Sequence, residues 1–229
     1  MGAGSPIRMY NGYNMSALNI FEIYHSIQGE STHAGRKCVF IRLAGCNISC
    51  SYCDSTEAAS GQGTQMSIQQ VLEITHSLGA RLVEVTGGEP LIQPEAGALL
   101  AALLDAGFET LVETNGTMLI DQFDRRAGYI VDIKTPGSGE EGSFLEANLE
   151  MLSDKDEVKF VITCKEDFDW AARMVERWGS SRRSAVLLSP SQGKVEPHML
   201  AEWLLESRVD ARLNLQLHKI IWGPEATGV

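Results

Sequence analysis

Apolar residues fall into two kinds of run along this chain. Short runs rich in β-branched and aromatic residues predict strands, and longer stretches with apolar residues three or four positions apart predict helices. The predicted strands are residues 18–26, 37–44, 81–86, 108–114, 128–133, 157–163, 184–188 and 211–217. The predicted helices are residues 67–78, 94–107, 118–126, 142–152, 167–178 and 196–207.

The alternation of these strands and helices predicts βαβ units and a parallel sheet. An open doubly wound sheet would be favoured by a GxGxxG motif after the first strand, and the chain has none there. We therefore expect an α/β fold, a partial (β/α) barrel with a reduced or modified core and mostly parallel strands. Short linkers predict one domain over residues 19–229, preceded by a flexible N-terminal extension over residues 1–18.

Polar segments directly follow most of the predicted strands. They read "AGC", "TGGEP", "ETNGT", "DIKTP", "SPSQG" and "HK", beginning at residues 44, 86, 113, 132, 189 and 218. Ligands bind at the carboxyl ends of parallel strands, where such segments meet. The pattern predicts an active site along one rim of the sheet.

Composition narrows the class of partner. The formal net charge is −11 and no run of Lys or Arg supplies a basic face, so nucleic acid is not an expected partner. No apolar stretch reaches the roughly 20 residues that span a bilayer, and the first residues lack a signal-peptide pattern. We expect a cytoplasmic protein, without a membrane partner, that acts on small molecules. Its five cysteines, an odd number, agree with a compartment where disulfides are rare.

Three cysteines crowd the loop after the second predicted strand: Cys46, Cys50 and Cys53 have the spacing C-x-x-x-C-x-x-C. Thiolates suit zinc and iron–sulfur clusters. A cluster of four irons held by three cysteines keeps one iron open for another ligand, whereas a structural zinc ion needs a fourth side chain. Candidates for that fourth side chain are His25, His33 and His76. The spacing alone leaves both kinds of site open.

This spacing, with Tyr52 directly before the last cysteine, resembles the cluster motif of the radical S-adenosylmethionine superfamily. The resemblance implies a 4Fe-4S cluster whose open iron binds S-adenosylmethionine, and one electron from the cluster then releases a 5′-deoxyadenosyl radical. The segment "TGGEP" is similar to the glycine segment that meets the cofactor's amino group. The resemblance implies cofactor contacts at Gly88, Glu89, Glu113, Asn115, Asp132, Ile133, Lys134, Ser189, Pro190, Ser191 and Gln192.

Three further segments narrow the resemblance. "IQGES" at 27–31, "CDST" at 53–56 and "LQLHKIIWGP" at 215–224 together resemble the 7-carboxy-7-deazaguanine synthase family, over residues 19–224. This implies conversion of 6-carboxy-5,6,7,8-tetrahydropterin to 7-carboxy-7-deazaguanine with loss of ammonia, in the synthesis of deazapurines such as queuosine. The implied substrate contacts are Ile27, Gln28, Gly29, Glu30, Arg42, Thr86, His218 and Pro224.

The same resemblance implies a magnesium ion held partly by the hydroxyl of Ser55, where other members have threonine. It also implies a homodimer and an external one-electron reductant, flavodoxin-like or ferredoxin-like. The sequence identifies no general base. Two alternatives are a related activase, which takes hydrogen from a glycine of a partner protein, and a non-enzymatic zinc-binding module.

Overall fold

The computed structural model describes residues 17–179 and 183–228, and within them the strands form one nine-stranded sheet. The strands are β1 (Leu18–Ile27), β2 (Lys37–Leu43), β3 (Thr64–Met66), β4 (Leu82–Gly87), β5 (Glu109–Thr114), β6 (Gly128–Asp132), β7 (Glu157–Ile162), β8 (Ala185–Pro190) and β9 (Arg212–Leu213). Their order is β3-β1-β2-β4-β5-β6-β7-β8-β9. The neighbours from β2 to β9 are parallel, whereas β1 is antiparallel to β2 and β3. The sheet is open and mostly parallel, as predicted.

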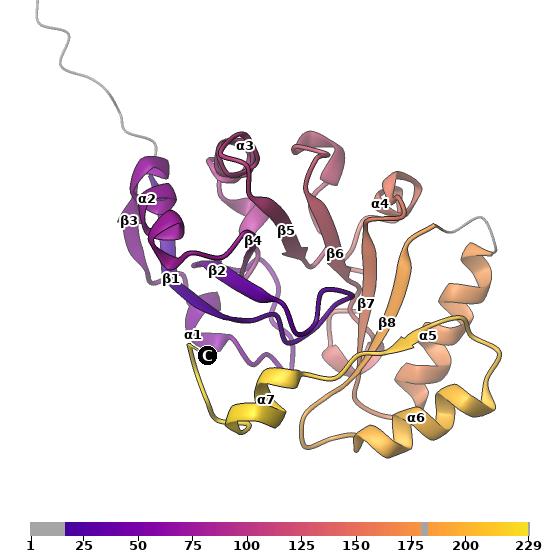
Figure 1. Cartoon of the computed structure of the whole chain (residues 1–229). Coiled ribbons are helices and arrows are strands. Elements are labelled where there is room, and N and C mark those ends of the chain that lie inside the picture. The colour runs from indigo at the N-terminus through magenta and orange to yellow at the C-terminus, as the bar shows by residue number, and fades with distance from the viewer. Residues whose placement is uncertain (1–16, 180–182, 229) are drawn as a thin grey trace, which may run out of the picture.

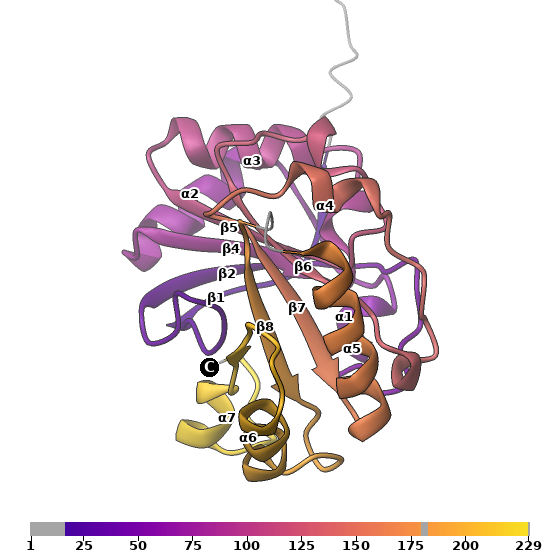
Figure 2. The same ribbon diagram turned by 90° about the vertical axis from the view of Figure 1, so that its right-hand side faces the viewer.

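Helices cover one side of this curved sheet, and the β1–β2 loop and the last helix lie on the other (Figures 1 and 2). The helices are α1 (Thr56–Ala59), α2 (Ile68–Leu78), α3 (Ala96–Asp105), α4 (Ala147–Met151), α5 (Lys165–Trp178), α6 (Pro197–Glu206) and α7 (Leu217–Trp222). Short 3-10 turns are η1 (Pro90–Ile92), η2 (Ile120–Gln122) and η3 (Pro136–Ser138). Among the described residues, none of these helices has the length and apolar character needed to cross a bilayer.

The main core lies between the sheet and its helices. Because successive side chains of a strand point to opposite faces, alternate residues such as Val39 and Ile41, or Val83 and Val85, enter this core. The intervening residues face the concave side of the sheet. There Cys38, Phe40, Leu82, Leu111 and Ile130 form a separate, smaller apolar cluster. The concave face is thus apolar at the start of the strands and becomes polar toward their ends.

Local signals account for the long helices. A capping box begins α2, with Ser67 accepting from the Gln70 main-chain N–H and the Gln70 side chain bonding back, and Gly79 ends the helix at φ 71°. In α5 one face is apolar, and its residues Phe168, Ala171 and Val175 are buried against the core.

Several short elements differ from the sequence prediction. The predicted helix over 118–126 is only the turn η2, and that over 142–152 shrinks to α4. The predicted last strand, 211–217, keeps two residues as β9. The small elements β3, α1 and α7 were not predicted. All are too short for a periodic apolar pattern to identify.

The predicted N-terminal extension falls mostly on residues 1–16, which lie outside the described residues. Leu18, the last residue of that predicted extension, begins β1, is fully buried and pairs with Met66 of β3.

Candidate active site

The cysteine loop connects β2 to α1 and carries three free, partly exposed thiols, Cys46, Cys50 and Cys53. Neighbouring loops hold it in place. Ser51 donates from its main-chain N–H to Ser138 O at 2.9 Å and from its hydroxyl to Gly137 O at 2.8 Å. Burial raises the pKa of Cys50 to about 11, so a bound metal centre would have to supply the charge that favours the thiolate.

No group of three or more His, Cys, Asp or Glu side chains in the described part of the chain is arranged to hold a metal ion. The sulfur ligands of a four-iron cluster sit at separate corners, so they need not converge on one point. Three partly exposed cysteines in one loop fit such a cluster.

The glycine segment packs directly against the start of the cysteine loop. A Cβ atom on Gly88 would lie 2.2 Å from Gly45 O and 2.8 Å from the Cys46 Cβ, so no larger residue fits there. Gly87, at φ 146°, is equally confined by the main chain of Leu43. Main-chain bonds from Gly88 to Leu43 and from Glu89 to Gly45 fix the contact. The sequence prediction that these two segments share one rim is confirmed by these contacts.

Glu89 is fully buried at the end of this segment. Its carboxyl group accepts hydrogen bonds from Leu91 N at 3.0 Å, Thr114 Oγ1 at 2.8 Å and Asn115 N at 2.6 Å. Burial raises its pKa to about 7. Both oxygens are therefore engaged within the protein, and the group joins the loops after β4 and β5. Asn115 in turn donates to Asn47 of the cysteine loop at 3.0 Å.

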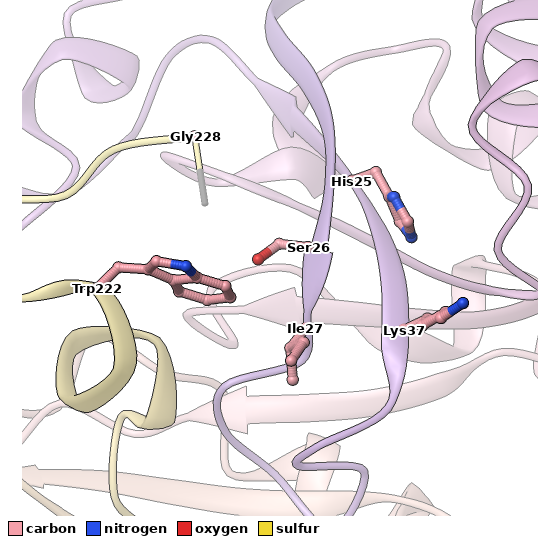
Figure 3. Close-up of a pocket in the computed structure, with 6 residues that line it drawn as sticks. All are labelled: His25, Ser26, Ile27, Lys37, Trp222 and Gly228. Carbon is pink, nitrogen blue, oxygen red and sulfur yellow. The ribbon is translucent and has the colours of Figure 1, made fainter.

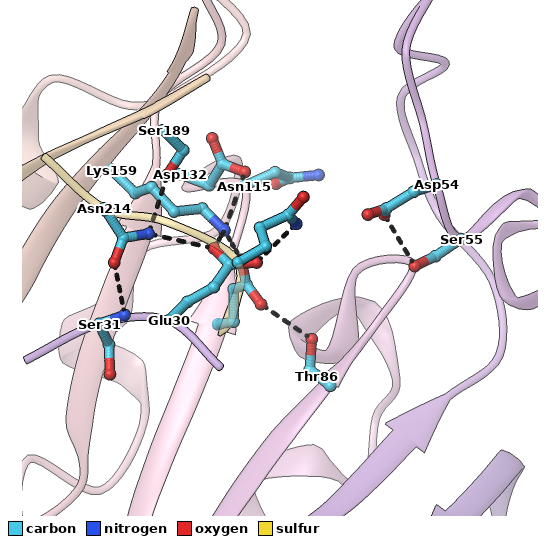
Figure 4. A network of polar contacts seen from close by, with 12 residues as sticks. Glu30, Ser31, Asp54, Ser55, Thr86, Asn115, Asp132, Lys159, Ser189 and Asn214 are labelled. Carbon is cyan, nitrogen blue, oxygen red and sulfur yellow. Dashed lines mark hydrogen bonds and ion pairs between the residues drawn. The ribbon is translucent and has the colours of Figure 1, made fainter. Parts of the chain in front are cut away.

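The segment 27–30 reaches the site by a route that the sequence did not suggest. Because β1 is antiparallel to β2, its end lies at the opposite end of the sheet from the cysteine loop. The loop 28–36 then crosses the concave face toward β7 and β8. Figure 4 shows Glu30 and Ser31 of this loop beside Lys159, Ser189 and Asn214. Ser31, at φ 65°, donates from its main chain to Asn214 Oδ1 at 2.9 Å.

Lys159 is the centre of the charged network on the concave face, and sequence analysis did not identify it. From β7 it contacts Glu113, Glu30 at 3.1 Å and Asp132 at 3.8 Å. Burial alone would lower its pKa, but these carboxylates raise it well above the ordinary value. Lysine in a run such as "EVKFVIT" gave no signal, because a charge in a strand is usually solvated. Lys134 makes a separate contact with Asp132 at 2.8 Å.

Glu30 joins the hairpin loop, which is the loop 28–36 between β1 and β2, to the C-terminal segment. Its carboxylate accepts from Gln216 at 2.8 Å and from Asn214 at 3.3 Å, and it pairs with Lys159. Burial would raise its pKa, but Lys159 and the Gln216 amide hold the pKa below the ordinary value. Asn214 and Gln216 are further residues that sequence analysis missed.

Arg42 and Ser55 lie together beside the cysteine loop. The Arg42 guanidinium donates to Glu22 at 2.8 Å, to the Ser55 hydroxyl at 3.1 Å and to the Tyr24 hydroxyl at 3.0 Å. These bonds use three of its five N–H groups and leave two for a ligand. Ser55 donates to Asp54 at 3.2 Å (Figure 4). The predicted substrate arginine and the predicted magnesium ligand are thus direct neighbours.

The predicted position of His218 after a strand is wrong, because it lies in α7. A Cβ atom on Gly29 would lie 2.1 Å from the Nδ1 atom of His218, and Leu217 N donates to Gly29 O at 2.9 Å. Burial lowers the pKa of His218 from its ordinary value. Pro224 follows α7 and is exposed. The histidine therefore lies against the hairpin loop, whereas Pro224 lies at the surface.

The remaining predicted cofactor residues are not equally available. Ile133 is fully buried in the main core, so only its main chain can meet a ligand. Ser189 is buried and its hydroxyl accepts from Asn214 at 2.8 Å. Ser191 is also buried, with its N–H on Ile162 O at 2.9 Å, whereas Pro190 is partly buried and Gln192 is exposed. Thr86 is buried and donates to Glu113 at 3.4 Å.

A pocket of about 300 Å³ lies outside this network. Figure 3 shows its lining from β1, β2 and the C-terminal segment: His25, Ser26, Ile27, Lys37, Trp222 and Gly228. Of the predicted site residues, Ile27 alone lines it.

Comparisons with known proteins agree with this arrangement. Residues 40–137, which include the cysteine loop and the glycine segment, match the Radical SAM superfamily. A 7-carboxy-7-deazaguanine synthase of Chlorobaculum tepidum is 42% identical over 93% of this chain and 97% of that protein. The 7-carboxy-7-deazaguanine synthase of Koribacter versatilis is 40% identical over 93% of this chain and all of that protein.

A solved structure supports the fold. The chain resembles QueE from Escherichia coli with a TM-score of 0.72 and 23% identity, over 91% of this chain and all of the other. The Radical SAM match implies a 4Fe-4S cluster and S-adenosylmethionine, and it decides against the zinc-binding module. With identities of 40% and above over nearly the whole chain, this protein belongs to the 7-carboxy-7-deazaguanine synthase family of radical S-adenosylmethionine enzymes.

Proposed function

We propose that the chain converts 6-carboxy-5,6,7,8-tetrahydropterin to 7-carboxy-7-deazaguanine with release of ammonia. The observation that carries the proposal is the direct contact of Arg42 with Ser55, two residues after the last cysteine. It brings a group suited to a carboxylate next to the metal loop. The hairpin residues Gln28 and Glu30 approach the same concave face from the other end of the sheet.

Cys46, Cys50 and Cys53 would hold the cluster, and Gly88, whose main chain packs against Cys46, would meet S-adenosylmethionine beside it. When bound, these groups supply the single electron and the carbon radical that start the ring contraction. Asp132, Lys134, Ser189, Ser191 and the other predicted cofactor residues would line the cofactor's side of the rim. The protein's contribution is placement, which can lower a barrier by about 7–11 kcal/mol.

The substrate would be held by the concave face. A planar guanidinium binds a carboxylate through two parallel hydrogen bonds, and Arg42 keeps two N–H groups for it. The amide of Gln28 and the hydroxyl of Thr86 suit the donors and acceptors at the edge of the pterin. His218, packed on Gly29, would close the pocket from the side of α7.

We infer that Ser55 binds magnesium together with the substrate carboxylate. The hydroxyl and the neighbouring Asp54 are oxygen donors, which magnesium prefers. The Arg42 guanidinium at 3.1 Å would lose its bond to the hydroxyl or share it when a metal ion binds.

The enzyme would need an external one-electron reductant, and we propose that it pairs as a homodimer. Three successive apolar side chains on α7, Ile220, Ile221 and Trp222, are exposed and would suit a second copy. The mass in solution tests this. A dimer would have about twice the 25.0 kDa of one chain and would dissociate in an Ile220→Glu variant, whereas a 25.0 kDa species would contradict it.

An anaerobic assay with reductant, carboxypterin, S-adenosylmethionine and magnesium, read by mass spectrometry, tests the function. We expect 7-carboxy-7-deazaguanine and 5′-deoxyadenosine to appear together. Cleavage of S-adenosylmethionine without a deazapurine product would instead favour an activase.

A further inference from the structure

Glu84 is a buried acid to which the proposed reaction assigns no role. Because strand residues alternate between faces, its side chain projects from β4 onto the concave face, as does that of Thr86 two residues later. Glu84 is 4% exposed. Its carboxyl group accepts a hydrogen bond from Gln28 Nε2. Acids this deeply buried usually have a cation beside them, and a carboxylate without one is costly.

The cation of the network is engaged elsewhere. Lys159 contacts Glu30 on the hairpin loop, Glu113 on β5 and Asp132 on β6. Glu113 and Glu30 bring negative charge toward Glu84, and the Lys159 ammonium that acts on Glu84 is shared with these carboxylates. Lys134 forms an ion pair with Asp132 at 2.8 Å. Among the described residues, a negative charge on Glu84 would have the Gln28 N–H and this shared ammonium beside it, but no ion pair of its own.

The groups that face Glu84 from β1 and β2 do not supply a cation either. Tyr24 and Cys38 lie there, and burial raises the pKa of both side chains, so both are neutral near pH 7. Arg42, further along β2, is paired with Glu22. Burial raises the pKa of Glu84 to about 8, and the charges of Glu113 and Glu30 act in the same direction, whereas Lys159 and the hydrogen bond from Gln28 act against the rise without cancelling it.

Glu84 and the Glu30 main chain together set how the Gln28 amide is turned. Gln28 Oε1 accepts from Glu30 N at 3.0 Å, while its Nε2 donates to Glu84. Turning the amide over would lose the first bond and place two N–H groups against each other. One N–H of Nε2 is left for a ligand.

We propose that Glu84 is a positioning residue, which as an uncharged carboxyl group fixes the Gln28 amide in the orientation that meets the substrate. The choice of substrate rests on the proposed function. The orientation and the charge state rest on the contacts within the chain.

The kinetic test compares Glu84→Gln, which stays uncharged and can accept from Gln28, with Glu84→Leu, which cannot. We expect Glu84→Gln to keep its kcat/KM for carboxypterin within about threefold at pH 7. Glu84→Leu should raise that KM about tenfold, the loss of one hydrogen bond, and leave the KM for S-adenosylmethionine unchanged. Equal changes in both KM values, or no change, would overturn the role.

A double-mutant cycle tests whether Glu84 acts through Gln28. In a Gln28→Ala background, Glu84→Leu should raise the pterin KM no further, because the group that it orients is absent. Independent, multiplying effects of the two substitutions would contradict the proposal. The wild-type KM for carboxypterin should also rise as the pH passes about 8, where Glu84 ionises near an anionic substrate, and Glu84→Gln should not show this rise.

A third measurement needs no substrate. Urea unfolding of the cluster-loaded protein is compared with that of Glu84→Gln from pH 5 to pH 9. The folded wild type keeps a proton that the unfolded chain releases above 4.5, so its stability relative to the variant should fall with rising pH and level off above about 8. If the difference in unfolding free energy between the two proteins did not change with pH, Glu84 would not be uncharged in the folded protein.

Asp124→Asn is the matched control. Asp124 pairs with Arg126, and the hydrogen bonds from Arg126 lower its pKa from 3.8 to about 2, so its difference should be flat over the same pH range. If carboxypterin is not turned over by the wild type, the proposed function fails, whereas the unfolding data still decide the state of Glu84.

Discussion

Cysteines in this chain differ by place rather than by chemistry. Cys46, Cys50 and Cys53 are partly exposed in one loop, while Cys38 is fully buried in β2. Cys164 is partly exposed and directly precedes α5. The spacing of the loop cysteines was readable from sequence because ligand spacing in one loop is local.

Replacing one loop cysteine should therefore remove the metal centre and spare the fold. We expect Cys50→Ala to lose the visible absorbance of the cluster and 5′-deoxyadenosine production, with its circular dichroism unchanged. Cys164→Ser, which alters a thiol outside the loop, is the control and should keep both signals. Full 5′-deoxyadenosine production by Cys50→Ala would contradict the ligand assignment.

Ser55 carries a prediction about magnesium. We expect Ser55→Ala to require a higher magnesium concentration for half-maximal rate, because one oxygen ligand is lost. Ser55→Thr keeps the hydroxyl and should titrate like the wild type. If the alanine variant gave an unchanged magnesium titration, the hydroxyl would not be a ligand.

Lys159 carries a prediction about the stability of the protein. Lys159→Met leaves the carboxylates of Glu30, Glu113 and Asp132 without their shared cation, and we expect about 3–5 kcal/mol lower free energy of unfolding at pH 7. The deficit should shrink as the pH falls toward the ordinary carboxyl pKa of 4.5, because protonation removes the unpaired charges.

Urea denaturation from pH 4.5 to 7 measures this deficit. Lys165→Met is the control, since Lys165 is 44% exposed and pairs with Asp169 one turn away in α5, a contact worth about 0.3–0.5 kcal/mol. A similar small loss for Lys159→Met would show that the buried network contributes little.

Most differences between the sequence prediction and the structure lie in short elements. The hairpin loop 28–36 and α7 form one wall of the proposed pocket, held by the Leu217 to Gly29 bond. Neither shows a hydrophobic period, and their contact joins residues almost 190 positions apart. Sequence reasoning found Gln28, Glu30 and His218 through the family resemblance, while the pairing of the two segments required the fold.

The contact between these two elements is testable at Gly29. Gly29→Ala places a methyl group 2.1 Å from His218 Nδ1 and 3.1 Å from its main-chain N, so we expect α7 to move away. Amide hydrogen exchange in residues 217–222 should become faster and the KM for carboxypterin should rise. Gly97→Ala, with its nearest atom at 3.7 Å, should change neither. Unchanged exchange in α7 would mean that the contact is not tight.

On the scale of the whole molecule, periodic apolar runs were sufficient to predict the parallel sheet, its long helices and the rim where the polar loops meet. They could not predict that β1 runs antiparallel, because a strand's direction is set by its connections and not by its own pattern. For the same reason, they could not bring Gln28 next to Glu84 or Glu30 next to Lys159.

Successive side chains of β4 point to opposite faces of the sheet, so mutations on the two faces should have different consequences. Val83 and Val85 face the helices, and Glu84 and Thr86 face the concave side of the sheet. In a saturation library, Val83 and Val85 should tolerate whatever preserves apolar volume and fail by losing soluble protein. Substitutions at Glu84 and Thr86 should leave well-expressed chains with lowered activity, so abundance and activity scores would separate within a single six-residue strand.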